Sequence, residues 1–270
     1  MQRRTFFAAG VALAAGSIAP LIHSAPQPLA TAPLTLPMAV NKAGRQRMLS
    51  QRCAKAWLML LAQADPSRAR QVLDGSMQLF ERQLVELASL QPGEVPAALG
   101  QLRAEWEAYE ALLRQTPSVD RAATLFRANE AVLAAAHRTT LAYEKAMGSA
   151  VGRLINVAGR QRMLSQRMAK FFFFQRLGVN SPEAVAGLDK ARIEFAEAHG
   201  LLMGAPENTS VLKRELALVE QQWFFFQAAL GKNADNGQAA GHVATTSERI
   251  LEQLDLCVSL YEGLATKSAA

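Results

Sequence analysis

The chain has 270 residues, half of them hydrophobic, and a formal net charge of +6. This hydrophobic content excludes a disordered chain, and the length allows one or two domains with their own cores. The basic balance suits nucleic acid, an acidic membrane surface or a small anion as a partner. The cysteines Cys53 and Cys257 lack the spacing of a zinc site and fall within helical patterns. This favours buried free thiols and leaves a disulfide between them open.

Residues 1–25 are interpreted as an export signal. A charged start is followed by a short run of Ala, Gly, Val and Leu and by small residues near position 25. The string Arg3-Arg4-Thr5-Phe6-Phe7 resembles a twin-arginine signal, and an ordinary secretory signal is the alternative. The apolar run is too short for a membrane anchor, so we expect a periplasmic protein. Residues 26–37 contain four prolines and are predicted to form an extended linker.

From Met38 onward, apolar residues recur at steps of three and four, which is typical of helices, and no segment alternates as a strand does. Residues 38–148 contain four such segments, with breaks at Asp65-Pro66, 91–93 and 116–118. Asp before Pro is a strong signal for the start of a helix. Spacing of this kind is typical of the seams between helices in a bundle, so a four-helix unit is predicted.

Residues 149–270 repeat this plan with four more helical segments. The predicted fold class is therefore all-α, with two tandem four-helix bundles. The stretch 139–176 contains no proline. This allows a continuous helix that joins the two units, with Gly148 and Gly152 as the positions of a kink.

A stretch of fifteen residues occurs at the start of both units, 115 residues apart. Thirteen of its positions are identical, in NKAGRQRMLSQRCAK at 41–55 and NVAGRQRMLSQRMAK at 156–170. The rest of the two units has diverged far more, so a constraint beyond packing acts on this stretch. It has five cationic side chains in the first copy, four in the second, and no acidic residue in either.

On a helix, with about 100° between residues, this stretch has two unlike faces. One face holds Leu49, Cys53 and Trp57 and belongs in the core of its own unit. The opposite face holds Gly44, and a glycine inside a helix costs about 1 kcal/mol against alanine. Because glycine lets another backbone approach closely, we expect the two copies to pack against each other through this face.

Such packing would bring Arg47 and Arg162 together. Two buried guanidinium groups need an anion between them, and a bound small anion would accept charge-assisted hydrogen bonds from both. The sequence leaves open whether the two arginines meet within one chain or across a homodimer. The other arginines of the stretch are expected to face solvent or acids from other helices. The further residues predicted to line the site are Asn41, Gly44, Met48, Gln51, Asn156, Gly159, Met163 and Gln166.

The motif Asn-x-Ala-Gly-Arg-Gln-Arg-Met-Leu-Ser-Gln-Arg, present in both units, resembles the signature of the PilJ-type domain. That domain is the N-terminal four-helix sensor module of type IV pilus chemoreceptors. The motif is also similar to the conserved helix of nitrate/nitrite sensor histidine kinases, in which an arginine three residues after a glycine binds nitrate between two subunits. The resemblance covers nearly all of residues 38–264 as two tandem modules. It implies nitrate-binding roles for Arg47 and Arg162, and close-approach roles for Gly44 and Gly159.

Two hypotheses on function follow. In the first, the chain is an exported small-anion binding protein, for nitrate or nitrite, and it signals through a separate membrane receptor, kinase or transporter. A separate partner is expected because the sequence shows neither the transmembrane helices nor the output domain of the sensor kinases. In the second, the repeated helix face serves dimerisation or assembly linked to a chemoreceptor or pilus, without a small ligand. The export signal argues against a role in binding nucleic acid, as does the scarcity of aromatic residues beside the basic ones.

Catalytic and metal-binding patterns are not found in the sequence. It contains no nucleophile–base constellation, glycine-rich phosphate loop or paired carboxylates, so neither an enzyme nor a cofactor is expected. His137, His199 and His242 share no metal-ligand spacing and are interpreted as structural or surface histidines.

Overall fold

The structure is a computed structural model that describes residues 33–231 and 238–268. All regular elements in these two ranges are α-helices, which confirms the all-α prediction. They are α1 (Leu36–Leu61), α2 (Pro66–Leu87), α3 (Val95–Leu113), α4 (Val119–Met147), α5 (Ala150–Arg176), α6 (Ser181–Met203), α7 (Ser210–Gly231) and α8 (Gln238–Ser268). The predicted export signal, residues 1–25, lies outside the described residues, as does most of the predicted linker. None of the helices described here is long and apolar enough to cross a membrane.

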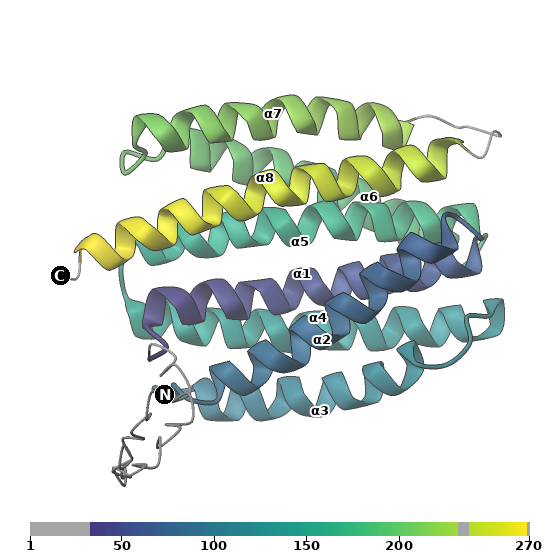
Figure 1. The fold of residues 1–270 in the computed structure, drawn as a ribbon, viewed down its shortest axis with the longest axis horizontal. Coiled ribbons are helices and arrows are strands. Elements are labelled where there is room, and N and C mark those ends of the chain that lie inside the picture. Colours follow the sequence, from purple (N-terminus) through teal and green to yellow (C-terminus); the bar gives the residue numbers. More distant parts are fainter. Residues whose placement is uncertain (1–32, 232–237, 269–270) are drawn as a thin grey trace, which may run out of the picture. The chain divides into compact units, whose positions relative to one another are not determined.

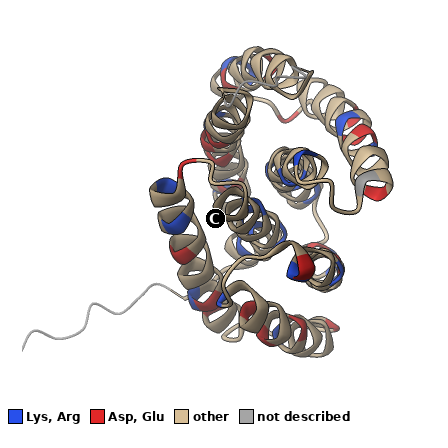
Figure 2. Cartoon of the chain, turned by 90° about the vertical axis from the view of Figure 1, so that its right-hand side faces the viewer, with Lys and Arg blue, Asp and Glu red and all other residues tan. Residues whose placement is uncertain are grey.

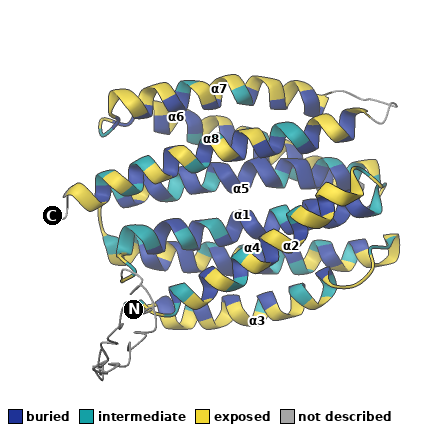
Figure 3. Cartoon of the chain, in the orientation of Figure 1, coloured by how far each residue is buried: buried dark blue, intermediate teal, exposed yellow. Residues whose placement is uncertain are grey.

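Helices α1–α4 form the first repeat and α5–α8 the second, and from Leu34 onward the chain forms one compact unit. α1 packs most extensively against α5, the first helix of the other repeat. α1 also packs against α2 and α4, and α5 against α6 and α8. Figure 1 shows α1 and α5 side by side in the middle of this unit. Figure 3 shows that both are buried along most of their length, so the repeated stretch lies at the centre of the packing.

The two repeats hold their third helix in the same way. In the first repeat, Trp106 on α3 stacks on Phe80 of α2, with ring centroids 3.7 Å apart. In the second repeat, Trp223 on α7 stacks on Phe195 of α6, with centroids 4.3 Å apart. All four rings are buried. Burial of large aromatic surfaces and offset stacking both stabilise such a contact, so one aromatic pair joins the second and third helices in each repeat.

A sharp turn joins the two repeats, and the continuous helix considered from the sequence is wrong. α4 stops before Gly148, which has a left-handed conformation with φ of +60°, and its N–H donates to the carbonyl oxygen of Glu144. α5 begins after Ser149, whose hydroxyl accepts a hydrogen bond from the N–H of Gly152. A glycine stop followed at once by a serine cap ends one helix and starts the next. The absence of proline was therefore not sufficient to predict a continuous helix.

Both cysteines are buried and free, as the helical patterns favoured. Burial raises the pKa of the Cys257 thiol to about 12, and it raises the pKa of Cys53 as well. Both side chains therefore remain protonated at neutral pH and pack as small apolar groups.

Replacement of Gly148 by alanine tests the break between the repeats. Because an L-residue is disfavoured at positive φ, Gly148→Ala is expected to lower the free energy of unfolding by about 1–2 kcal/mol, measured by urea denaturation. Gly75→Ala on α2 is the control, since a Cβ there meets nothing within 4 Å. It should raise the free energy of unfolding by about 0.5–1 kcal/mol through helix propensity. A stabilising Gly148→Ala would instead support a continuous helix.

Candidate anion site at the crossing of the repeated helices

α1 and α5 cross at a pair of glycines. A Cβ added to Gly159 would lie 3.9 Å from the Cα of Gly44. The same position is 3.4 Å from the Nη2 atom of Arg47 and 3.4 Å from that of Arg162. The glycines therefore let the two backbones approach closely, and both guanidinium groups lie beside this crossing.

Each of the two arginines reaches across to the other helix. Arg47 donates from Nη2 to the carbonyl oxygen of Asn156, 3.1 Å away. Arg162 donates from Nη2 to the carbonyl oxygen of Asn41 at 3.3 Å and to its Oδ1 at 2.9 Å. Both arginine side chains are almost completely buried, at 1% and 0% exposed. The arrangement repeats within one chain, so the two arginines meet here without a second copy of the protein.

The two asparagines of the crossing are themselves held by acids from the fourth helices. The side-chain amide of Asn156 donates to Glu144 at the end of α4, and that of Asn41 donates to Glu262 on α8, 2.5 Å away. Glu144 and Glu262 stand 118 residues apart. At this offset, each residue of α4 corresponds to the residue of α8 that lies 118 positions later in the sequence.

The two repeats differ in what contacts the Nη1 atoms of the two arginines. Arg162 donates from Nη1 to Asp255 Oδ1 at 2.5 Å. The residue 118 positions earlier is His137, and its Nδ1 lies 3.3 Å from Nη1 of Arg47. Within the two described ranges, Arg47 makes no ion pair with a carboxylate, whereas the Nε–H has no hydrogen-bond partner in either arginine. One buried guanidinium group is thus neutralised by the protein and the other is not.

The pKa values of Arg47 and His137 reflect the lack of a carboxylate beside Arg47. Burial and then the charges of Arg160 and Arg162 lower the pKa of Arg47 to about 9, against a smaller opposing effect of Glu144. Burial and then Arg47 lower the pKa of His137 to about 4. His137 is therefore neutral at neutral pH, and its Nδ1 accepts a hydrogen bond from the guanidinium group.

In the other half, a carboxylate balances the charge. Burial disfavours the ionised form of Asp255, but Arg162 and Arg45 outweigh this effect and hold its pKa below the ordinary value. Its Oδ1 accepts from both guanidinium groups, at 2.5 Å from Arg162 and 3.2 Å from Arg45. A single carboxylate oxygen therefore bridges two arginines.

Two further turns along, the repeated stretch supplies a second pair of charged clusters. Lys55 Nζ, which is buried, donates to Glu248 of α8 at 2.5 Å and to Gln166 Oε1 at 2.6 Å. Its counterpart Lys170 donates to Glu130 of α4 at 2.7 Å. Figure 2 shows Lys and Arg residues on helices in the interior as well as at the periphery. These clusters tie the first helix of each repeat to the fourth helix of the other repeat.

The carboxylates of these clusters are strongly stabilised in their charged form. Burial disfavours the ionised form of each, but the lysine and the arginine beside it outweigh this effect. They lower the pKa values of Glu130 and Glu248 to about 2. Arg167 lies 2.8 Å from Glu130, and Arg52 also pairs with Glu248.

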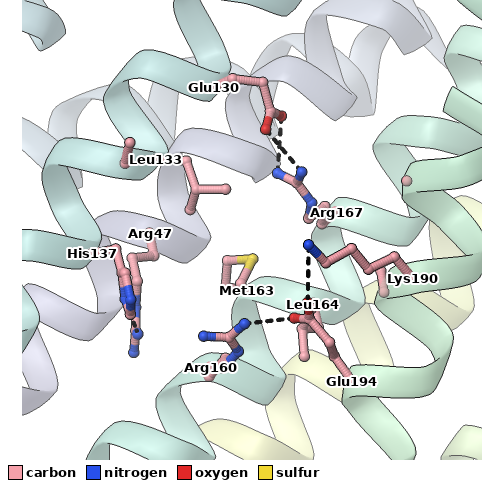
Figure 4. Close-up of a pocket in the computed structure, with 13 residues that line it drawn as sticks. Arg47, Glu130, Leu133, His137, Arg160, Met163, Leu164, Arg167, Lys190 and Glu194 are labelled. Atoms are coloured by element: carbon pink, nitrogen blue, oxygen red, sulfur yellow. Dashed lines mark hydrogen bonds and ion pairs between the residues drawn. The ribbon is translucent and has the colours of Figure 1, made fainter. Parts of the chain in front are cut away.

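A pocket opens beside Arg47 between α4, α5 and α6. Its volume is about 260 Å³. Figure 4 shows Arg47 with His137 and Arg160 toward one end of this pocket, and Arg167 with Glu130 toward the other. Arg160 donates from Nη2 to Glu194 at 2.6 Å. Lys190 and Gly187 also line the pocket, together with five apolar residues: Leu133, Ala134, Met163, Leu164 and Ala191.

The structure places the predicted site residues in two groups. Those around the crossing are Asn41, Gly44, Arg47, Asn156, Gly159 and Arg162. Gln51 and Gln166 lie with the charged clusters instead, where Arg167 is 3.5 Å from Gln51 and Lys55 contacts Gln166. Met48 is buried, and Met163 lines the pocket. That these residues bind an anion stays a prediction.

Sequence reasoning missed His137 and Asp255, which the fourth helices bring to the site, and Arg160 on α5. His137 was interpreted as a structural or surface histidine, and Asp255 and Arg160 were not assigned to the site. The signal was present, because Asn129-Glu130 and Ser247-Glu248 match across the repeats at the offset that pairs His137 with Asp255. In the described part of the chain no cluster of His, Cys, Asp and Glu could hold a metal ion.

The fold and this site define an internally duplicated, all-helical module whose halves meet through their first helices. Comparison with known protein families identifies it further. The family PilJ, described as the N-terminal part of the type IV pili methyl-accepting chemotaxis transducer, matches residues 38–127 and 145–248. The chain belongs to this family. The two matched segments correspond to the two repeats, which confirms the resemblance to tandem PilJ-type domains.

Comparisons with curated proteins and with solved structures gave no significant match. The family is described as part of a chemotaxis transducer, which points to a sensing or signalling module rather than to a catalytic family.

Removal of one carboxylate from the charged clusters tests how much they stabilise the fold. Glu248→Gln leaves Lys55 buried without its counter-charge, so the free energy of unfolding is expected to fall by about 3–5 kcal/mol. Glu94→Gln is the matched control, because Glu94 pairs with Lys145 at the surface and both side chains are more than 70% exposed. That change should have no measurable effect on stability, because exposed ion pairs contribute little. Equal effects in urea denaturation would show that the buried cluster is not special.

The low pKa of His137 predicts a pH dependence of stability. The unfolded chain takes up a proton at this histidine near its ordinary pKa of 6.5, whereas the folded chain does so only near 4. Stability should therefore fall as the pH drops from about 6.5 to 4, because the unfolded state binds more protons there. His137→Gln should flatten this part of the curve of thermal midpoint against pH. His242→Gln, at an exposed position on α8, serves as the control for the substitution itself.

Proposed function

We propose that the chain is an exported sensor or accessory protein that binds one small anion, nitrate or nitrite, between Arg47 and Arg162. The observation that carries this proposal is the state of Arg47. It is a buried guanidinium group with no carboxylate partner and with an unpaired Nε–H. A buried cation is costly unless it is paired, and a bound anion would supply the missing charge.

The geometry of the crossing supports a small, planar anion. Both Nη2 atoms lie within 3.4 Å of one point beside Gly159. Guanidinium forks match the planar oxygens of carboxylate-like anions through paired, charge-assisted hydrogen bonds. The resemblance of the repeated motif to the helix of nitrate sensors favours nitrate or nitrite among such anions. The two repeats would form in one chain what those kinases form as a dimer.

The proposed route of the signal runs through a separate protein. The predicted export signal supports a binding event in the periplasm, next to a membrane receptor, kinase or transporter. Because the arginine helix of one repeat is tied to the fourth helix of the other, an anion at the crossing would change the balance of charge across both repeats. Through these ion pairs, anion binding at the crossing would affect the outer surface of the protein.

The alternative is an interaction or dimerisation module without a small ligand, and one surface favours it. Phe224 and Phe225, on α7, are 68% and 57% exposed. In the first repeat, the two residues after Trp106 are Glu107 and Ala108. The fold therefore does not require phenylalanine at these places, and exposed apolar residues of this kind are typical of a contact with another protein.

Calorimetric titration of the purified chain with nitrate, nitrite, sulfate and chloride tests the proposal. We expect saturable binding of nitrate or nitrite at one anion per chain. Arg47→Gln and Arg162→Gln should each weaken it roughly tenfold or more, since hydrogen bonds to charged groups contribute most to such binding. Arg103→Gln, on the exposed face of α3, is the control. Absence of binding by all four anions would favour the interaction module, and unchanged affinity in both arginine variants would move the site elsewhere.

A further inference from the structure

The second repeat shows what group the first repeat lacks. In the second repeat, the carboxylate of Asp255 lies between two arginines, and one of its oxygens accepts hydrogen bonds from Arg162 and Arg45. The repeat register relates Arg162 to Arg47 and Arg45 to Arg160, both at the offset of 115 residues. The equivalent pair is therefore Arg47 of the first repeat and Arg160 of the second, and His137 stands in the place of the aspartate beside it.

The matching position in the first repeat adjoins open space. Arg47, His137 and Arg160 all line the pocket between α4, α5 and α6. The charge of Arg160 is, after burial, the largest influence that disfavours the charged form of Arg47, so the two guanidinium groups repel each other. Arg160 uses Nη2 for Glu194, and a guanidinium group carries five N–H donors. Donors therefore remain on both arginines for a group that enters from the pocket.

We propose that a small organic monocarboxylate binds in this pocket, with its carboxylate bridging Arg47 and Arg160 as the carboxylate of Asp255 bridges Arg162 and Arg45. The ligand supplies from outside the group that the second repeat carries in its own chain. The inference takes from the proposed function the role of Arg47 as an anion-binding group, and it replaces Arg162 by Arg160 as the second arginine.

The pocket also indicates the class of the ligand. Its volume of about 260 Å³ exceeds what a lone inorganic anion fills. Lys190 and Glu194 also line the pocket, but much of the wall between the arginine end and the opposite end is apolar, with Leu133 and Met163 among its side chains, and this surface suits a short hydrocarbon body. At the opposite end, Arg167 is already paired with Glu130. A second carboxylate on the ligand would meet this acid, so a monocarboxylate fits better than a dicarboxylate.

Titration of the full chain with benzoate and butyrate tests the inference, with benzyl alcohol as a probe that lacks the carboxylate. We expect saturable binding of at least one carboxylate at one per chain and none of the alcohol. Arg160→Gln should weaken this binding about tenfold or more. Arg45→Gln, the same change at the matching position of the other repeat, should not alter it. Equal effects of the two changes, or no binding of either carboxylate, would overturn the inference.

A second test uses a variant in which both arginines of the site are kept. His137→Asp rebuilds in the first repeat the bridge that Asp255 forms in the second. A carboxylate of the chain itself would then occupy the place proposed for the carboxylate of the ligand. This variant is expected to melt at a higher temperature than the unchanged protein and to lose carboxylate binding. Asp255→Asn, which leaves the pocket intact, should lower the melting temperature and retain binding. A His137→Asp protein that binds benzoate as well as the unchanged protein would contradict the inference.

The outcomes separate this inference from the proposed function. Nitrate bound between the two repeated helices depends on Arg162, whereas the carboxylate depends on Arg160. If Arg162→Gln abolishes nitrate binding and no carboxylate binds, the inference fails and the proposed function stands. If carboxylates bind through Arg160 while nitrate does not bind, the proposed ligand is wrong and the inference stands.

Discussion

The burial of positive charge at the close crossing of α1 and α5 is the constraint on which the rest of the structure depends. Two glycines allow the helices to approach, and two guanidinium groups occupy the space beside them. Neither helix carries an acid in its repeated stretch, so neutralisation must come from outside it. The fourth helices provide most of it, through Asp255, Glu248 and Glu130. These ion pairs join each fourth helix to the first helices: Asp255 pairs with Arg162 in its own repeat, and Glu248 and Glu130 pair with lysines of the other repeat.

Because the chain is duplicated, each residue of one repeat can be compared with its counterpart in the other. At the packing level, Ala56 and Val72 of the first repeat correspond to Phe171 and Gly187 of the second. A Cβ on Gly187 would lie 2.5 Å from the ring of Phe171, so the large and the small residue have exchanged places and the volume is conserved. The Nζ of Lys170 lies 4.2 Å from the centre of that ring, where a cation is attracted by the aromatic face. Differences of this kind are compensated within the repeat.

The exchange of Asp255 for His137 leaves Arg47 without a carboxylate partner among the described residues, whereas Arg160 pairs with Glu194. An aspartate removed from between two arginines leaves two like charges close together, and an imidazole with a pKa of about 4 offers no negative charge in return. Such an arrangement lowers stability, as strained or uncompensated groups at functional sites commonly do. Its retention beside a pocket of about 260 Å³ is the physical reason to look for a ligand there rather than in the neutralised half.

The sequence was sufficient for the helices and for the meeting of the two repeated stretches, because both follow from local periodicity and from glycine at a helix face. It also placed Arg47 and Arg162 together, since the repeat itself supplies both partners. It did not reveal the turn at Gly148, where the signal is a two-residue stop and start rather than a proline. His137, Asp255 and Arg160 were missed for a different reason. Their roles depend on which side chains of neighbouring helices each one meets, and only the packed structure determines that.

A duplicated chain can do what a symmetric dimer of one unit cannot. In a dimer of identical subunits both halves carry the same residues, so a carboxylate that neutralises one arginine also neutralises the other. In this chain the halves are encoded separately. One half has Asp255, which pairs with Arg162, while the other has His137 at the equivalent position and leaves Arg47 without a carboxylate partner among the described residues. The neutralised half stabilises the crossing, so one buried cation can lack a counter-charge without the loss of the fold around it.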